Sequence, residues 1–124
     1  MIRHVIVLFF LACLWLAAPA DAADEVSGID LCRDFSLIAK DVMTARQKKR
    51  PMSETLPNAI KLIEDWAKKY GVEMSWKDAE EGAALLVIPA DGRAAYPIDS
   101  ARQDAIRDFE NDHFEECYKG LTSD

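Results

Sequence analysis

The chain has 124 residues, with 15 lysine and arginine residues against 22 aspartate and glutamate residues, so its formal net charge is −7. Half of the residues are apolar and 30% are charged, which excludes an intrinsically disordered or collagen-like chain, and the length allows one domain. A net acidic chain is also a poor candidate for binding a nucleic acid, because a phosphate backbone demands clustered lysine and arginine.

Residues 1–22 have the pattern of a signal peptide. A short basic region precedes an apolar run, 5–16, and Ala20 and Ala22 supply the small side chains that a signal peptidase requires. A membrane span needs about twenty apolar residues, so this run is too short to remain as an anchor. We therefore expect export to the periplasm or out of the cell, with cleavage after Ala22 and a single mature domain, 23–124.

The alternative for this leader is a lipoprotein signal. Leu11 and Ala12 precede Cys13, which would carry the lipid, but Phe10 occupies a position where leucine is preferred. Lipidation at Cys13 would hold the protein on a membrane surface. Plain cleavage is favoured, because lipidation would also leave the apolar residues 14–16 on the mature chain.

Two cysteines, Cys32 and Cys117, remain after the leader is removed, and they stand near the two ends of the mature domain. An even count in an oxidising compartment favours one disulfide bond between them. On the chain-entropy model, closing a loop of about 85 residues stabilises a fold by roughly 4 kcal/mol. The alternative is a reactive thiol or a metal ligand, for which the chain lacks a Cys-x-x-Cys spacing.

A first helix is predicted from Ser27 to about Lys48. Ser27 with Asp30 three residues later is typical of a capping box, and Pro51 ends the helix. Apolar residues recur at spacings of three and four, which places them on one helix face. That face comprises Cys32, Phe35, Ala39, Val42 and Arg46, flanked by Leu31, Ile38 and Met43.

A second helix is predicted from Ser53 to Tyr70, with Ser53 as its N-cap. Pro57 falls at the edge of the first turn, where its missing N–H costs least. Gly71 is a natural C-terminal stop. One face again steps by three and four along the chain, through Leu56, Ile60, Ile63, Ala67 and Tyr70.

The third segment has two interpretations. Ser75 with Asp78 is typical of a capping box, and the spacing that follows favours a helix over about 76–95, kinked near Pro89. The apolar run and turn residues of 85–92 are equally compatible with a strand that enters a hairpin turn. The helix is preferred, because an isolated hairpin beside three helices would be marginal in water.

A fourth helix is predicted to begin with Asp99 or Ser100 as its cap and to reach about Lys119, with Gly120 as its stop. Its apolar face comprises Ile106, Phe109, His113 and Cys117. The expected fold is therefore all-α, a small domain of four helices (three if the third segment is a hairpin). One disulfide is expected to join the first helix to the last.

Scattered positions over most of residues 30–118 carry a resemblance. They are Cys32, Ala45-Arg46-Gln47, Pro51-Met52-Ser53-Glu54, Ala95-Tyr96-Pro97, Ile106, Phe109 and Cys117. Through them the mature chain resembles a loose group of small exported bacterial proteins, mostly without an assigned function. That group usually has a glycine shortly after the Arg-Gln pair, where this chain has Lys48-Lys49-Arg50. The resemblance implies a helical fold with one terminal disulfide and transfers no activity. Size, export and one disulfide are also similar to those of periplasmic acid-stress chaperones, at the level of architecture.

The only histidine of the mature chain, His113, follows Glu110 by three residues, so both side chains share a helix face. Known helical metal sites need such a pair twice, with further carboxylates, and this chain has no second copy. It also lacks a Gly-x-Ser-x-Gly elbow and a glycine-rich phosphate loop. We expect no catalytic residue, metal or cofactor. The alternative is a metal-binding protein or enzyme that uses Glu110, His113 and a free Cys117.

Two groups of residues are candidate docking points. A basic cluster at the end of the first helix comprises Arg46, Lys48, Lys49 and Arg50. Cations there complement the helix macrodipole, and the functional interpretation is a site for anionic lipid headgroups or an acidic partner. An acidic run on the fourth helix, 108–116, would neutralise the basic cluster if the two helices are neighbours. Trp66 and Trp76 are core residues or, if exposed, anchors for a protein partner.

By elimination, the sequence favours an exported binding or interaction protein, inhibitor-like or chaperone-like, over an enzyme. The expected partner is another protein of the cell envelope and not a nucleic acid. A membrane is involved only if Cys13 is lipidated or the basic cluster binds a membrane surface. The oligomeric state is left open by the sequence.

Overall fold

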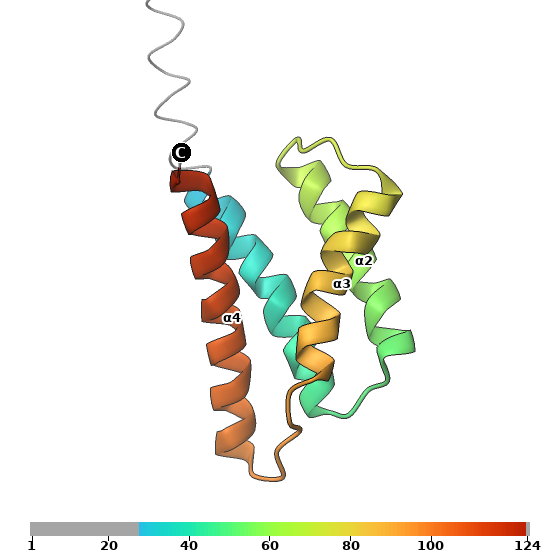
Figure 1. Cartoon of the computed structure of the whole chain (residues 1–124), viewed down its shortest axis with the longest axis vertical. Coiled ribbons are helices and arrows are strands. Elements are labelled where there is room, and N and C mark those ends of the chain that lie inside the picture. Colours follow the sequence, from blue (N-terminus) through green and yellow to red (C-terminus); the bar gives the residue numbers. More distant parts are fainter. Residues whose placement is uncertain (1–27, 124) are drawn as a thin grey trace, which may run out of the picture.

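The computed structural model describes residues 28–123, which form four helices in up-down-up-down order (Figure 1). The first helix covers residues 28–47, and it is followed by α2 (Met52–Lys69), α3 (Trp76–Asp91) and α4 (Asp99–Thr122). No strand occurs within this part of the chain. The predicted all-α fold is confirmed, and the third segment is a helix rather than a hairpin.

Three sequence predictions concern residues outside this range. They are the leader 1–22 with its cleavage after Ala22, lipidation at Cys13, and Ser27 as the cap of the first helix.

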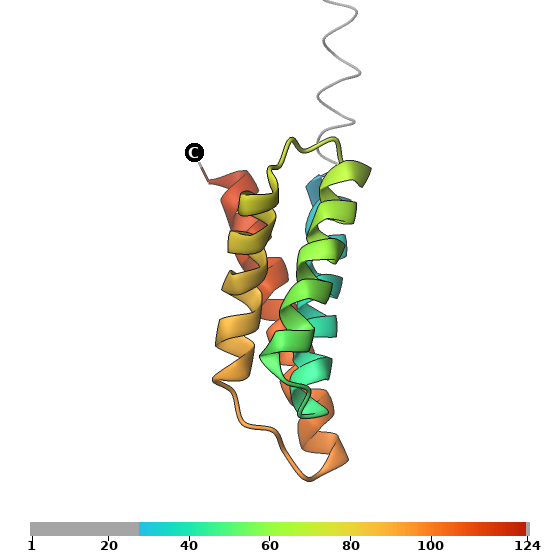
Figure 2. The same ribbon diagram turned by 90° about the vertical axis from the view of Figure 1, so that its right-hand side faces the viewer.

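The four helices form two layers of two. The first helix and α2 make one layer, and α3 and α4 make the other (Figure 2). α3 packs closely on α2, whereas α3 and α4 diverge and make hardly any close backbone contact (Figure 1). The layer formed by α3 and α4 is therefore the less closely packed of the two pairs that involve α3.

One apolar core fills the space between the layers. Its largest fully buried side chains are Phe109, Met43, Ile63, Leu86 and Val42. α3 contributes mainly alanines to this core, and short side chains let its backbone approach α2 closely. The predicted apolar faces therefore point inward, although Phe35 and Tyr70 are only half-buried.

The predicted disulfide is present. Cys32 and Cys117 join the first helix to α4 across 85 positions of sequence, with their Cα atoms 5.5 Å apart. Cys32 is fully buried. The bond holds the C-terminal half of α4 on the first helix, while Ile106 and Phe109 bury the preceding turns of α4 in the core.

The helix starts confirm one predicted cap and correct two. Ser75 and Asp78 form the predicted capping box through two reciprocal hydrogen bonds of 3.1 Å. Ser53 does not cap α2, because the carbonyl of Pro51 already accepts the N–H of Glu54 and starts the helix earlier. Likewise, neither Asp99 nor Ser100 caps α4. Both lie in its first turn, and Ile98 is the cap residue, without a side-chain hydrogen bond.

The helix ends also confirm one prediction and correct two. Gly71 stops α2 in the left-handed conformation, with a φ of 66°, and the N–H of Val72 donates to the carbonyl of Ala67 at 2.8 Å. Gly120 does not stop α4, which continues to Thr122. α3 ends at Asp91 and not near Ala95, because the residues that follow are bound to the first helix.

Those bonds form what we call the loop latch. The side chain of Gln47, which is 5% exposed, donates to the carbonyl of Ala94 (2.9 Å) and accepts the N–H of Tyr96 (3.0 Å). Arg46 donates from Nε to the carbonyl of Arg93 at 2.8 Å. The stretches 45–47 and 95–97, which carry part of the sequence resemblance, thus meet in space and fix the connection from α3 to α4.

The two glycines near helix ends are expected to respond to alanine in opposite directions. Gly71→Ala should lower the free energy of unfolding by about 1 kcal/mol or more, because a Cβ is disfavoured at positive φ. Gly120→Ala should raise it by up to about 1 kcal/mol, because alanine is the better helix former. A new Cβ meets no atom within 4 Å at either position, so packing does not obscure the comparison.

The measurement is denaturant unfolding of both variants and the wild type with the disulfide intact. A stabilising Gly71→Ala would contradict the left-handed stop of α2. A Gly120→Ala variant that is destabilised by as much as Gly71→Ala would show that α4 ends where the sequence alone suggested.

Candidate functional site

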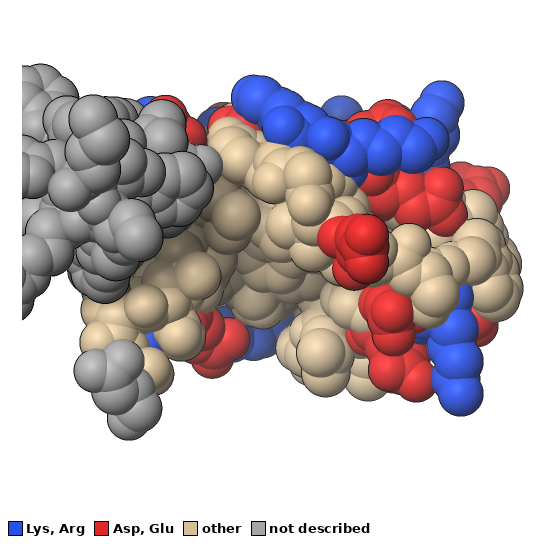
Figure 3. All heavy atoms as spheres, turned by 90° about the horizontal axis from the view of Figure 1, so that it is seen from above, with Lys and Arg blue, Asp and Glu red and all other residues tan. Residues whose placement is uncertain are grey.

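A groove of about 370 Å³ lies between α3 and α4. One wall includes Leu85 and Pro89 of α3 and Arg93 of the following loop. The other wall consists of α4 residues, among them Phe109, Asp112 and His113. Figure 3, viewed from above, shows a hollow of uncharged surface at the centre of the molecule, with acidic side chains to either side of it.

The helical spacing explains why these side chains share the groove. Leu85 and Pro89 are four positions apart and lie on one side of α3, and Phe109, Asp112 and Glu116 lie on one side of α4 in the same way. Phe109 is fully buried at the base, whereas Leu85 is 74% exposed on the wall. The result is a buried aromatic floor and an apolar wall that is open to water at Leu85, with charged groups along the rim.

Both basic residues that line the groove, Arg93 and Lys119, contact other groove residues. Lys119 Nζ lies 2.7 Å from Glu115 Oε1, and this hydrogen bond lowers the pKa of the Glu115 carboxyl and raises the pKa of Lys119. The Arg93 guanidinium lies 5.8 Å from the centre of the Phe109 ring. Within residues 28–123, no lysine or arginine lies within 4 Å of the carboxylates of Asp112 and Glu116.

The residues proposed for a metal do not converge. The His113 ring packs on Phe109, with ring centres 4.3 Å apart, and its Nδ1 donates to the Phe109 carbonyl at 2.9 Å. Glu110 lies instead 4.0 Å from Lys40 of the first helix. Cys117 is held in the disulfide. Within the described part of the chain, no three histidine, cysteine, aspartate or glutamate side chains are placed to hold a metal ion.

The basic cluster is split by the structure. Arg46 belongs to the loop latch and lies 3.9 Å from Asp91 of α3, while Lys48, Lys49 and Arg50 are exposed. The proposed pairing with the acidic run 108–116 is not formed. The first helix and α4 are antiparallel, so the C-terminal end of the first helix lies beside the start of α4, away from that run.

The two tryptophans have different surroundings. The indole N–H of Trp66 donates to the carbonyl of Leu31 at 3.0 Å, and its ring packs on Phe35 with centres 5.4 Å apart. Trp76, the first residue of α3, is 63% exposed. Of the pair, only Trp76 is accessible to a partner.

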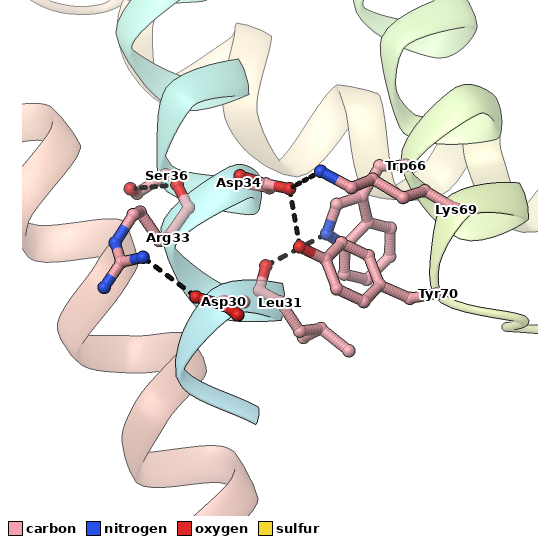
Figure 4. Close-up of polar contacts among 8 residues, drawn as sticks. All are labelled: Asp30, Leu31, Arg33, Asp34, Ser36, Trp66, Lys69 and Tyr70. Atoms are coloured by element: carbon pink, nitrogen blue, oxygen red, sulfur yellow. Dashed lines mark hydrogen bonds and ion pairs between the residues drawn. The ribbon is translucent and has the colours of Figure 1, made fainter. Parts of the chain in front are cut away.

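A polar cluster between the first helix and α2 was not expected from the sequence (Figure 4). Asp34 Oδ2 accepts hydrogen bonds from Lys69 Nζ, at 2.6 Å, and from the Tyr70 hydroxyl. The Lys69 bond, and then the Tyr70 bond, lower the pKa of Asp34. The bonds to Asp34 also raise the pKa values of Lys69 and Tyr70. Together with the Trp66–Leu31 bond, this cluster ties the end of α2 to the first helix.

Comparison of the chain with protein-family models, with curated proteins and with solved structures finds no match. None of the helices in the described residues has the length and apolar character needed to cross a membrane.

Replacing Asp34 is expected to lower the Tm by an amount that depends on pH. A lowered pKa means that the Asp34 carboxylate stabilises the fold fully above its ordinary pKa of 3.8 and loses this effect as the pH falls through the native value. Asp34→Asn should therefore lower the Tm at neutral pH, and the difference from the wild type should shrink below about pH 4.

Thermal unfolding of both proteins from neutral to acidic pH measures this difference. Asp65→Asn is the matched control, since Asp65 is an exposed carboxylate on α2 outside the cluster. A Tm difference for Asp34→Asn that stays constant into strong acid would contradict the role of the ionised carboxylate.

Proposed function

We propose that this protein is a small exported helical binding protein, inhibitor-like or chaperone-like, that holds a segment of another polypeptide in the groove between α3 and α4. The observation that carries the proposal is the exposed apolar wall beside a buried aromatic floor. Leu85 is 74% exposed directly at the groove, next to the fully buried Phe109.

The energetics of this arrangement favour a partner. Burying an exposed leucine side chain stabilises a complex by roughly 1.5–3 kcal/mol. Leu85 is exposed in the free protein, so a partner that covers it gains this free energy. Binding surfaces commonly combine an apolar centre with a polar rim that excludes water from it. Leu85, beside the buried Phe109, supplies such a centre, and the charged residues of α4 supply such a rim.

Export is the second part of the proposal. It rests on the leader pattern of residues 1–22, and the bond between Cys32 and Cys117 supports it, because disulfides persist in oxidising compartments. The mature protein then begins at Ala23 and keeps the whole helical domain.

The intact mass of protein recovered from an export-competent host tests the leader and the bridge together. After alkylation without reduction, we expect a chain that begins at Ala23 and carries no label; after reduction, it should carry two labels. A retained leader would contradict export with cleavage. Label on both cysteines before reduction would contradict the disulfide, and a lipid-sized addition at Cys13 would establish membrane anchoring instead.

Selection from a displayed library of random peptides tests the groove. Peptides enriched on the disulfide-bonded protein should bind Leu85→Asp about tenfold more weakly or worse, because a charge then replaces the apolar wall. Ile88→Asp is the matched control. Ile88 is similarly exposed on α3, at 61%, but does not line the groove.

The peptides should bind Ile88→Asp as they bind the wild type. The proposal fails if the selection enriches no peptide, or if the enriched peptides bind Leu85→Asp unchanged. Circular dichroism of both variants confirms that the helical fold is intact.

A further inference from the structure

We infer that the groove selects a cationic amphipathic helix. In this arrangement, apolar side chains of the ligand cover Leu85, above the buried Phe109, and its lysine or arginine side chains face Asp112 and Glu116. The inference rests on the proposed function and adds to it the conformation and the charge of the bound segment.

The helical walls of the groove favour a helical ligand over an extended one. Both α3 and α4 satisfy their backbone hydrogen bonds internally, and residues 28–123 contain no strand edge, so an extended peptide finds no ladder to join. A helix needs only an apolar stripe to pack between two diverging helices. The α4 wall from Phe109 to Lys119 extends about 15 Å, the length of about ten helical residues.

The charge of the ligand follows from which rim groups lack a partner. Glu115 and Lys119 neutralise each other at 2.7 Å. Asp112 and Glu116 are exposed, stand one helical turn apart, and have no cation within 4 Å among the described residues. With Arg93 and Lys119 set against Asp112, Glu115 and Glu116, the residues that line the groove carry a net charge of −1, which favours a ligand whose basic residues flank its apolar stripe.

The whole chain adds to this preference. Its net charge is −7, and removal of the leader takes away one arginine and one aspartate and leaves that value unchanged. An acidic segment is repelled on approach, and a basic one is attracted. The same charge opposes a second copy of this chain as the occupant, because two molecules of charge −7 repel each other.

Two synthetic peptides of about twelve residues test the inference. Both carry leucine at positions i, i+3, i+4 and i+7, and the remaining positions are lysine in one and glutamate in the other. A third peptide has the composition of the lysine peptide in an order without a helical stripe. Fluorescence anisotropy measures their binding to the disulfide-bonded protein.

We expect the lysine peptide to bind roughly tenfold more tightly than the glutamate peptide, and more tightly than the reordered one. The double variant Asp112→Lys/Glu116→Lys should remove or reverse the preference. The matched control is Asp65→Lys/Glu73→Lys, which changes the net charge equally at exposed positions outside the groove and should retain it.

Four outcomes would overturn the inference. If both double variants lost the preference for the lysine peptide equally, the preference would depend on net charge and not on the groove. If the lysine and glutamate peptides bound equally, the groove would not select by charge. Binding of neither peptide, while library peptides still require Leu85, would also reject the cationic helix and leave the proposed function intact. Sedimentation that shows a dimer dissociated by Leu85→Asp would identify a second copy as the occupant.

Discussion

The attachment of α4 is the constraint on which the rest of the structure depends. α4 is the longest helix, with 24 residues, yet only Ile106 and Phe109 among them are buried. Two buried side chains contribute about 1.5–3 kcal/mol each, a small apolar anchor for a helix of this length. The Cys32–Cys117 bond adds roughly 4 kcal/mol on the chain-entropy model and fixes the half of α4 that the core does not hold.

This mode of attachment also produces the groove. α3 packs on α2 through its alanine-rich face, while the disulfide binds α4 to the first helix and the loop latch binds the connection from α3 to α4 to that same helix. Neither set of contacts draws α3 and α4 together. A helix held mainly by its own packing would have to cover Leu85 of α3, whereas α4 leaves this side chain open to water.

The sequence predicted features that are set locally and missed those set by packing. The capping box of Ser75 and the left-handed stop at Gly71 each depend on a few neighbouring residues, and both were found. Ser53 was misassigned because Pro51 supplies the first carbonyl, and Gly120 because a glycine near a helix end need not stop it. The groove depends on the divergence of two helices, for which no local pattern exists. Its α4 residues were named for other reasons, Phe109 and His113 as an apolar face and Asp112, Glu115 and Glu116 within the acidic run, and the α3 residues Leu85 and Pro89 were not connected with them.

The residues that carry the resemblance to small exported proteins take on a physical meaning in this fold. Cys32 and Cys117 form the disulfide, 45–47 and 95–97 meet in the loop latch, and Ile106 lies in the core. Of these positions, only Phe109 also lines the groove, and it does so from the floor. These positions therefore belong mostly to the scaffold, whereas Leu85, Asp112 and Glu116 lie at the surface of the groove. Because the apolar core, the disulfide and the loop latch hold the scaffold, the exposed rim residues Asp112 and Glu116 are free to match the charge of a ligand. The order of the helices also keeps the basic cluster apart from the acidic run. Because the first helix and α4 are antiparallel, the basic cluster at the end of the first helix lies beside the start of α4, away from the acidic run in the middle of α4, and the acidic groups Asp112 and Glu116 stay beside the groove.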